Sequence, residues 1–216
     1  MVSGLYVITT SVPHMGRSHL DIAEAAVAGG AQVIQLREKN ETGNILEMAR
    51  RLRELTRRAG IKFIVNDRVD IALAAEADGV HLGQEDVSFS AARGVLGNQR
   101  IIGISATSIE EAIEAERQGA DYLGVGPIFP TPSKSDAAEP MGCGLLAEIR
   151  RRVKIPLVAI GGITADNLEE VLSAGADSVA VISAVAAAPD MELATRELAE
   201  RIERVKKEAQ SSEHRA

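Results

Sequence analysis

Aromatic residues are scarce in this chain of 216 residues, and their scarcity excludes one class of partner. Only 2% of the residues are aromatic and none is Trp, so the stacked side chains that hold single-stranded nucleic acid are not expected. The net charge of −7 also argues against a surface for nucleic acid or for anionic membranes. A bound phosphate group must therefore be held locally, by a few basic side chains.

Cysteine occurs once, and no hydrophobic run is long enough to cross a membrane. Cys143 cannot form an internal disulfide, which fits a reducing cytosol. It stands where the pattern indicates a helix start, so we expect it to pack rather than to act as a nucleophile. The N-terminus lacks the basic start and the long apolar segment of a signal peptide. The sequence thus predicts a cytoplasmic protein with no membrane partner.

Short β-rich runs recur along the chain, separated by enough residues for a crossover helix. There are eight such runs: Leu5–Thr10, Val33–Lys39, Phe63–Arg68, Gly79–Gln84, Ile101–Ala106, Tyr122–Ile128, Leu157–Ile163 and Ser178–Ser183. Helical patterns fill most of the gaps, over 47–59, 108–118, 166–174 and 192–207. The third and fourth crossovers are short. Ser108 followed by Glu111 forms a capping box, which predicts the start of a helix.

Small residues recur where a helix gives way to a strand, at 29–31, 119–121 and 175–177. Gly suits the left-handed residue that ends a helix. Alternating strands and helices joined by such turns predict a parallel sheet, and eight of them predict a single α/β TIM barrel over residues 1–205. An open doubly wound sheet is the alternative, although no Gly-x-Gly-x-x-Gly follows the first run. The polar residues 206–216 are expected to form a frayed tail.

Polar side chains alternate along the end of the second run, Gln-Leu-Arg-Glu-Lys. Gln35, Arg37 and Lys39 share one face of this strand, and Ile34 and Leu36 share the face that packs under helices. Three long polar side chains inside a barrel are costly without a partner. An anion is one such partner, because Arg offers a planar fork to phosphate oxygens and Lys offers a point charge. An internal ion-pair network is the alternative.

Carboxylates follow the next two strands. Asn66 and Asp67 end the third run, and Asp86 lies just past the fourth. The ends of neighbouring parallel strands meet at one edge, and carboxylate oxygens are hard ligands suited to Mg²⁺. The alternative is that Asp67 and Asp86 merely cap the helices that follow them.

Three further loops have residues that suit a phosphate. The irregular segment after the sixth run carries the hydroxyls of Thr131 and Ser133 and the charge of Lys134, although it could be an uneventful surface loop. The residues 161–162 and 182–183 end the seventh and eighth runs, and loops in these places often bind phosphate through backbone N–H groups. A tight turn is the alternative role of the glycines at 161–162, but their location favours binding.

Histidines offer little chemistry in this sequence. His81 lies on the face of the fourth run opposite Val80 and Leu82, so we expect a hydrogen-bonded interior residue rather than a base. No pair of histidines has the spacing of a metal site, which makes zinc improbable.

Taken together, these residues make the chain resemble the thiamine-phosphate synthase family over about residues 5 to 205. The matching motifs are QLREK at 35–39, VNDR at 65–68, DGVHLGQED at 78–86, GISA at 103–106, GVGPIFPTPSK at 124–134, AIGGI at 159–163 and VISA at 181–184. Any one of them alone would be weak, but in this order they are highly specific.

The resemblance implies a Mg²⁺-dependent transferase of thiamine biosynthesis. It would couple hydroxymethylpyrimidine diphosphate with a thiazole phosphate, or with its carboxylated precursor, giving thiamine phosphate and pyrophosphate. The residues that would hold the pyrimidine diphosphate are Gln35, Arg37, Lys39, Asn66, Ser105 and Lys134, of which Arg37, Lys39 and Lys134 would be catalytic. Those that would surround the thiazole phosphate are Thr131, Pro132, Ser133, Gly162, Ile182 and Ser183. Asp67 and Asp86 would bind Mg²⁺.

Two positions depart from the family pattern. Ser133 stands where Thr is usual and keeps the hydroxyl, and Thr107 stands where many members have His. The related thiazole tautomerases are thought to use that His and commonly lack the metal carboxylates. An isomerase of that kind, or another phosphate-sugar epimerase, is therefore one rival, and an inactive binding protein is another. Intact Asp67, Asp86 and Lys134 favour the synthase. Barrels often pair through their outer faces, so a homo-oligomer is allowed, but no patch indicates its contact surface.

Overall fold

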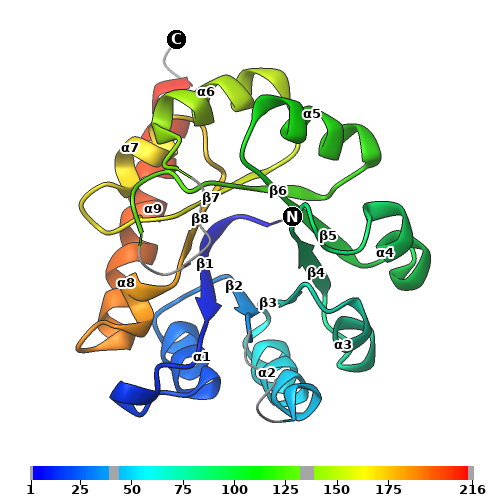
Figure 1. The fold of residues 1–216 in the computed structure, drawn as a ribbon. Helices are drawn as coiled ribbons and strands as arrows, with labels where there is room; N and C mark the ends of the chain where they lie inside the picture. Colours follow the sequence, from blue (N-terminus) through cyan, green and yellow to red (C-terminus); the bar gives the residue numbers. More distant parts are fainter. Residues whose placement is uncertain (1, 39–43, 132–138, 214–216) are drawn as a thin grey trace.

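Eight parallel strands close into a barrel in the computed structural model, which describes residues 2–38, 44–131 and 139–213. The strands follow one another in sequence order, and β8 pairs with β1 to close the ring. Figure 1 shows the strands as an inner ring with the helices around it. The expected TIM barrel is therefore confirmed, and the open doubly wound sheet is wrong because no edge strand is left unpaired in this ring.

The strands are short and the crossovers are helical. The strands are β1 (Gly4–Thr9), β2 (Val33–Leu36), β3 (Lys62–Asn66), β4 (Gly79–Leu82), β5 (Ile101–Ala106), β6 (Tyr122–Val125), β7 (Leu157–Ile160) and β8 (Ser178–Val181). The helices are η1 (Pro13–Met15), α1 (His19–Ala28), α2 (Ile45–Ala59), α3 (Val69–Ala74), α4 (Phe89–Leu96), α5 (Ile109–Gln118), α6 (Gly142–Arg152), α7 (Leu168–Ser173), α8 (Ser183–Ala186) and α9 (Met191–Glu213). Several strands end earlier than expected because their last polar residues already belong to loops. Within the described part of the chain, no helix is both long and apolar enough to span a membrane.

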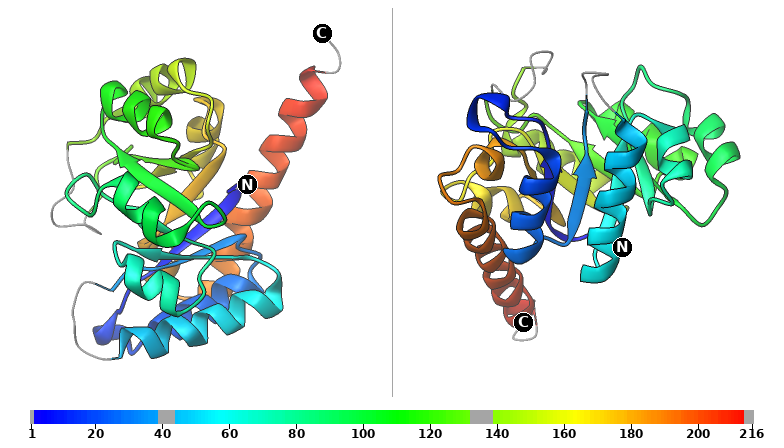
Figure 2. Two further views of the ribbon diagram at one scale, coloured as in Figure 1. Left: turned by 90° about the vertical axis from the view of Figure 1, so that its right-hand side faces the viewer. Right: turned by 90° about the horizontal axis from the view of Figure 1, so that it is seen from below.

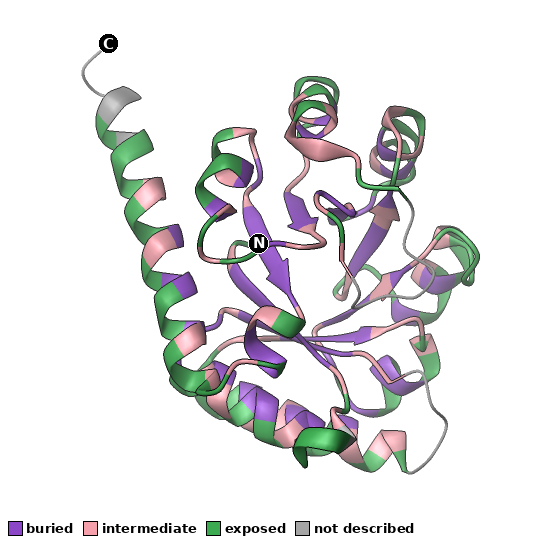
Figure 3. Cartoon of the chain, turned by 60° about the vertical axis from the view of Figure 1, so that its left-hand side comes forward, coloured by how far each residue is buried: buried purple, intermediate pink, exposed green. Residues whose placement is uncertain are grey.

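Strand side chains alternate between the inside of the barrel and the layer beneath the helices. The inner cluster contains Tyr6, Ile8, Val33, Ile64, Tyr122, Val158 and Ala180, closed at one end by Val2. The outer cluster is larger and joins residues such as Leu5, Ile34 and Phe63 to the buried helix faces. Figure 3 shows this division, with buried residues on the strands and on the inward sides of the helices.

The same type of hydrogen bond recurs before each even-numbered strand, where a side chain in the turn accepts a backbone N–H of the preceding strand. Before β4, the Asp78 carboxylate accepts the backbone N–H of Phe63 and a guanidinium N–H of Arg53, both at 2.9 Å. The same arrangement recurs as Asp121 with Ile102 and Arg93, and as Asp177 with Leu157 and Arg150. Before β2, the Gln32 side-chain oxygen accepts the N–H of Leu5 at 2.6 Å. These bonds pair backbone groups at the N-terminal face, the face of a barrel that serves stability.

The expected helix boundaries are confirmed in part. Gly119 and Gly175, which follow α5 and α7, have φ of +95° and +104°, the left-handed conformation that ends a helix. At the start of α5, the Ser108 hydroxyl accepts the N–H of Glu111 at 3.2 Å. The Glu111 carboxylate, however, bonds to the N–H and hydroxyl of Thr107 instead of to Ser108. Only half of the predicted capping box is therefore formed.

Helix α9 includes residues 206–213 of the tail that the sequence predicts to be frayed, and residues 214–216 of that tail lie outside the described residues. The helix continues to Glu213, and Figure 2 shows its C-terminal part extending past the barrel. Leu198 and Ile202 are buried in the outer cluster and anchor the first half. Farther along, an i,i+4 ion pair of 3.6 Å joins Glu203 to Lys207, and such pairs support a polar helix beyond its packed part.

Candidate active site

Polar residues gather where the strands end, and the C-terminal ends of a closed parallel barrel form one rim. The predicted site residues that the structure describes lie at this rim: Gln35, Arg37, Asn66, Asp67, Asp86, Ser105, Thr131, Gly162, Ile182 and Ser183. Four others, Lys39, Pro132, Ser133 and Lys134, lie outside the described residues. Arg37, Asp67 and Asp86 follow the successive strands β2, β3 and β4, so opposite charges are brought to neighbouring sectors of the rim.

Asp67 has an unusual backbone conformation. Its φ of +61° lies in the left-handed region, which few residues other than Gly adopt. Its N–H donates to the carbonyl oxygen of His81 at 2.8 Å, which ties the end of β3 to β4. Asn66, the last residue of β3, stands opposite His81 in the register of the two strands. Conformations of this kind cluster at functional sites because the surrounding contacts must hold them in place.

Asp86 closes the turn after β4. Its carboxylate accepts the N–H of Gly83 at 2.6 Å, and the side chain is exposed. The N-cap of α4 is Ser88, whose hydroxyl accepts a backbone N–H of that helix at 3.3 Å. Helix α3 begins after Arg68 without a side-chain cap. The helix-cap interpretation of Asp67 and Asp86 is therefore wrong.

Two carboxylates on adjacent strand ends match the way in which proteins hold Mg²⁺. This ion prefers oxygen ligands, commonly takes one or two carboxylates, and completes its coordination with water and substrate phosphates. In residues 2–38, 44–131 and 139–213, no group of three or more His, Cys, Asp or Glu could hold a metal ion. Asp67 and Asp86 therefore fit an ion shared with a substrate better than one enclosed by the protein.

The loops after β6 and β7 pack backbone against backbone. Hydrogen bonds of 2.9 and 3.0 Å join residues 128–129 to residues 160–161. Gly162 has φ +64°, and a Cβ added there would lie 2.6 Å from the carbonyl oxygen of Pro130, so the approach requires Gly. Thr131 follows Pro130 directly. The tertiary structure thus brings the segments of Thr131 and Gly162 together, although they come from separate motifs.

A short helix follows β8 at the same rim. The carbonyl oxygen of Ile182 accepts the N–H groups of Val185 and Ala186 at 3.2 and 2.9 Å, which starts helix α8 at the exposed Ser183. In TIM barrels, the loops after strands seven and eight and a short extra helix frequently form a phosphate site. Gly162, Ile182 and Ser183 occupy these positions.

His81 points into the barrel and is hydrogen-bonded, as expected. Its Nδ1 lies 3.0 Å from the Tyr122 hydroxyl, and its Nε2 lies 3.0 Å from the Ser105 hydroxyl. Tyr122 contacts the Tyr6 hydroxyl at 3.0 Å, and Gln35 Nε2 donates to Tyr6 at 2.8 Å. Burial is the main cause that raises the pKa of each phenol. Sequence reasoning missed both tyrosines, although they are the only two in the chain and stand at inward strand positions.

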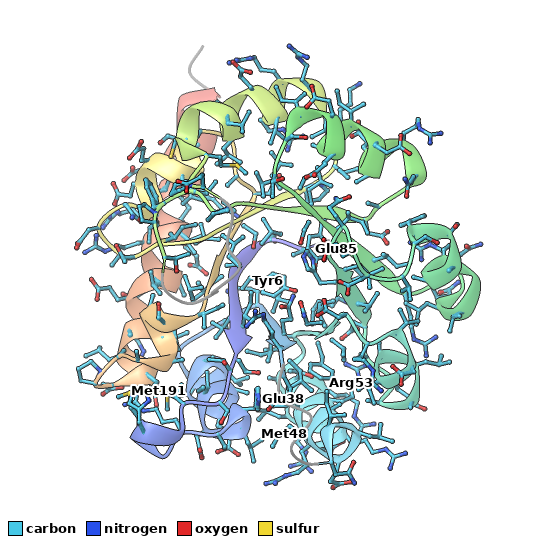
Figure 4. All side chains as sticks on the ribbon, in the orientation of Figure 1. Tyr6, Glu38, Met48, Arg53, Glu85 and Met191 are labelled. Atoms are coloured by element: carbon cyan, nitrogen blue, oxygen red, sulfur yellow. The ribbon has the colours of Figure 1, made fainter. Side chains whose placement is uncertain are left out.

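A second buried cluster was also missed. The imidazole of His19, on the first turn of α1, contacts the Thr9 hydroxyl through Nδ1 at 2.8 Å and the Glu38 carboxylate through Nε2 at 3.0 Å. Figure 4 labels Glu38 beside α1 and α2, and Tyr6 near the centre of the strand ring. Thr9, His19 and Glu38 come from β1, from α1 and from just past the end of β2, so no local pattern indicated their contact. The cluster holds the backbone next to Arg37.

Cys143, the second residue of α6, is a packed residue whose thiol is held protonated. Its side chain packs on the outer cluster. Burial and a hydrogen bond with Glu170 raise the pKa of the thiol to about 11, so the thiolate is rare at neutral pH. The expectation that this cysteine packs is confirmed.

Comparisons with known proteins place the chain beside one group of enzymes. The family model described as thiamine monophosphate synthase matches residues 5–185. The thiamine-phosphate synthase of Chloroflexus aurantiacus is 54% identical over 195 residues, which cover 90% of each chain. That of Methanospirillum hungatei is 50% identical over 201 residues, 93% of this chain and 98% of the other. Among solved structures, a thiamine phosphate pyrophosphorylase from Pyrococcus furiosus has a TM-score of 0.85 and 46% identity, covering 94% of this chain and 96% of that one.

Proposed function

Because the chain belongs to the thiamine monophosphate synthase family and is an enzyme that forms thiamine phosphate, we propose which substrates it joins and how. The substrates are hydroxymethylpyrimidine diphosphate and a thiazole phosphate or its carboxylated precursor. The second product is pyrophosphate, and the carboxylated precursor would also release carbon dioxide. The observation that carries this proposal is the single rim at which Arg37, Asp67 and Asp86 follow successive strands. A diphosphate is dense enough in negative charge to use basic side chains and a divalent cation together.

Basic groups from two loops neutralise the diphosphate. Arg37 presents a planar fork to two phosphate oxygens, and Lys39 and Lys134 add point charges. The pyrimidine and the adjoining phosphate are held by polar side chains of β2, β3 and β5, namely Gln35, Asn66 and Ser105. These side chains lie at or just inside the rim, so the reactive methylene group faces the loops after β6 to β8.

Asp67 and Asp86 would hold Mg²⁺ beside the diphosphate. When bound, this ion would supply positive charge to the oxygens of the leaving pyrophosphate. The bond from Gly83 N–H to Asp86 and the bond from Asp67 N–H to His81 hold both residues in place before the substrate arrives. Such preorganisation limits the side-chain entropy that binding must overcome.

The thiazole phosphate lies on the other side of the mouth. The residues proposed to surround it are Thr131, Pro132, Ser133, Gly162, Ile182 and Ser183. The loop of Gly162 follows β7 at the same rim, where backbone N–H groups often bind phosphate, and the hydroxyl of Ser183 is exposed at the start of α8. The contact between the β6 and β7 loops supports this side of the proposal, since it brings two of the implied segments together.

The reaction begins with loss of pyrophosphate. The C–O bond of the pyrimidine methylene breaks, its electron pair leaves with the oxygen, and the electron-rich aminopyrimidine shares the positive charge. Arg37, Lys39 and Lys134 stabilise the leaving group where its negative charge develops. The lone pair of the thiazole nitrogen then forms the new C–N bond. The protein need not supply a nucleophile, which agrees with the raised pKa of Cys143, about 11.

One assay tests this proposal directly. The purified chain is supplied with the pyrimidine diphosphate, the thiazole phosphate and Mg²⁺, and release of pyrophosphate is followed with and without EDTA. We expect stoichiometric pyrophosphate and thiamine phosphate, and loss of both with EDTA. Isomerisation of a thiazole without pyrophosphate release would contradict the proposed coupling, and full activity in EDTA would contradict the metal.

A further inference from the structure

A continuous chain of hydrogen bonds crosses the inside of the barrel. It runs from Gln35 on β2 to Tyr6 on β1, then to Tyr122 on β6, His81 on β4 and Ser105 on β5, with lengths of 2.8, 3.0, 3.0 and 3.0 Å. Both ends of this chain are residues proposed to hold the pyrimidine. The three middle residues, Tyr6, Tyr122 and His81, have no role in the function proposed above. We call these five residues the interior relay.

Glycines on two strands make room for the rings of the interior relay. A Cβ added at Gly103 would lie 2.0 Å from Cζ of Tyr122, and one added at Gly124 would lie 2.7 Å from Cε1 of His81. The rings of His81 and Tyr122 stack with their centroids 5.5 Å apart. The rings of Tyr122 and His81 thus occupy the space that side chains at positions 103 and 124 would fill. The interior relay is therefore part of the packing inside the barrel.

With Gln35 Nε2 as the donor to Tyr6, only one direction of the remaining hydrogen bonds gives every donor of the relay an acceptor. Tyr6 is fully buried and receives a hydrogen from Gln35 Nε2, so its own hydrogen must go to Tyr122, its other partner, to avoid an unsatisfied donor. By the same reasoning, the Tyr122 hydrogen goes to Nδ1 of His81. An imidazole that accepts at Nδ1 is neutral and carries its hydrogen on Nε2, which then donates to the Ser105 oxygen.

We propose that Tyr6, Tyr122 and His81 are positioning residues that fix the hydrogen-bonding direction of both pyrimidine-binding side chains. With Nε2 of Gln35 held by Tyr6, the amide presents its oxygen to the ligand as an acceptor. With its oxygen occupied by His81, Ser105 presents its hydroxyl hydrogen to the ligand as a donor. This inference rests on the proposed function, because the ligand is the pyrimidine diphosphate.

An acceptor and a donor set in this way distinguish pyrimidines by the substituent at position 4. A 4-aminopyrimidine offers amine hydrogens to Gln35 and a ring nitrogen lone pair to Ser105. A 4-oxopyrimidine offers the opposite pattern, with a carbonyl oxygen and a ring N–H. Gln35 can turn its amide to suit the oxo compound only if its bond to Tyr6 is lost or every bond of the relay reverses with it. The relay therefore makes the site specific for the amino form.

The tautomer of His81 is measured first, in the free protein at neutral pH. Nitrogen-15 NMR of the imidazole rings, with the His81 signals assigned from His81→Asn, is expected to show a protonated Nε2 and a bare Nδ1. The reverse tautomer would overturn the proposal, because it would reverse every bond in the relay and turn both end groups around. This measurement needs no substrate, so it stands even if the proposed reaction fails.

Specificity is measured next, by calorimetric binding of the 4-amino and 4-oxo pyrimidine diphosphates with Mg²⁺ present and no thiazole phosphate. The wild-type chain is expected to prefer the amino compound by about tenfold or more, because the mismatched compound leaves buried groups unpaired. Tyr6→Phe, which frees the Gln35 amide to turn, is expected to reduce this preference several-fold while keeping the ring and the fold. Tyr122→Phe is expected to give mixed His81 tautomers as well.

Thr56→Val is the matched control. Thr56 is also a fully buried hydroxyl, but it lies on α2 and donates to the Arg53 carbonyl oxygen at 3.1 Å, away from the relay. It is expected to keep the wild-type preference. An unchanged preference in folded Tyr6→Phe would overturn the proposal. If the wild-type chain binds neither compound and forms no thiamine phosphate, the proposed function fails instead, and the two failures are distinguishable.

Discussion

We predict that the two tyrosines make the stability of this enzyme fall steeply at alkaline pH. Tyr6 and Tyr122 are the only tyrosines, the chain has no Trp, and both phenols are buried. Burial is the main cause that raises the pKa of each phenol above the value of an unfolded chain. The folded state therefore binds these protons more tightly than the unfolded state. The resulting stability is complete below the unfolded pKa, about 10, and is lost as the pH rises above it.

The size of the effect follows from the linkage of folding to proton binding. One pH unit above the unfolded pKa, each phenol that stays protonated only in the folded state removes about 1.4 kcal/mol from the free energy of unfolding. The two phenols together remove roughly 3 kcal/mol near pH 11, a large share of the roughly 5–15 kcal/mol typical of a domain. We expect phenolate absorbance to appear together with unfolding, in a single cooperative step.

Denaturant unfolding at a series of pH values, followed by circular dichroism, provides the assay. The Tyr6→Phe, Tyr122→Phe double variant is the control, because it keeps both rings and cannot ionise them. Subtracting its stability from that of the wild-type chain isolates the contribution of the phenols from other alkaline titrations. Phenolate that appears reversibly near pH 10 in a chain with unchanged circular dichroism would refute the reasoning, since the hydroxyls would then be open to solvent.

Three further predictions concern the stability of the barrel, the proposed site and the cysteine. Asp177→Ala should lower the free energy of unfolding by about 1–3 kcal/mol in denaturant titrations, because it leaves the N–H of Leu157 without its partner. Asp67→Ala and Lys134→Ala should each lower kcat by about 10²–10³, as expected for loss of one contact to a developing charge. Cys143 should be alkylated by iodoacetamide with a midpoint at a pKa of about 11, as read by mass spectrometry over a pH series.

Each of these predictions has a control variant or a result that would contradict it. Asp166→Asn, at an exposed carboxylate, should leave stability unchanged, and an equal loss in both Asp variants would argue against the backbone bond as the cause. Near-normal turnover in both Asp67→Ala and Lys134→Ala would defeat the assignment of the site. Rapid alkylation of Cys143 at neutral pH would show that its thiol is not held protonated by its surroundings.

The local sequence pattern is sufficient to predict the strands and the polar residues at their C-terminal ends. Eight β-rich runs with helical crossovers allow few arrangements, because parallel strands need long connections and a closed ring leaves no edge unpaired. The alternation along Gln35, Leu36 and Arg37 could be followed from the sequence because strand side chains change face at every residue. The polar residues at the strand ends therefore follow from the sequence pattern alone, and the motifs that carry the family resemblance contain these same residues.

Long-range contacts could not be found in this way. The bonds from Tyr6 to Tyr122 and from His19 to Glu38 join residues that are distant in sequence or lie on different elements, and no periodicity links such pairs. The left-handed φ of Asp67 depends on its bond to β4, and the helix-cap interpretation failed because caps are decided by the turn geometry around each residue.

The sequence by itself thus determined the barrel, its polar rim and the chemical types of the groups there, since these depend on local periodicity and on which residue ends each strand. Only the tertiary structure decided how far α9 extends and which buried side chains pair across the barrel. Those features arise from packing between segments far apart in the chain, where the geometry of closure, and not local propensity, selects the partner.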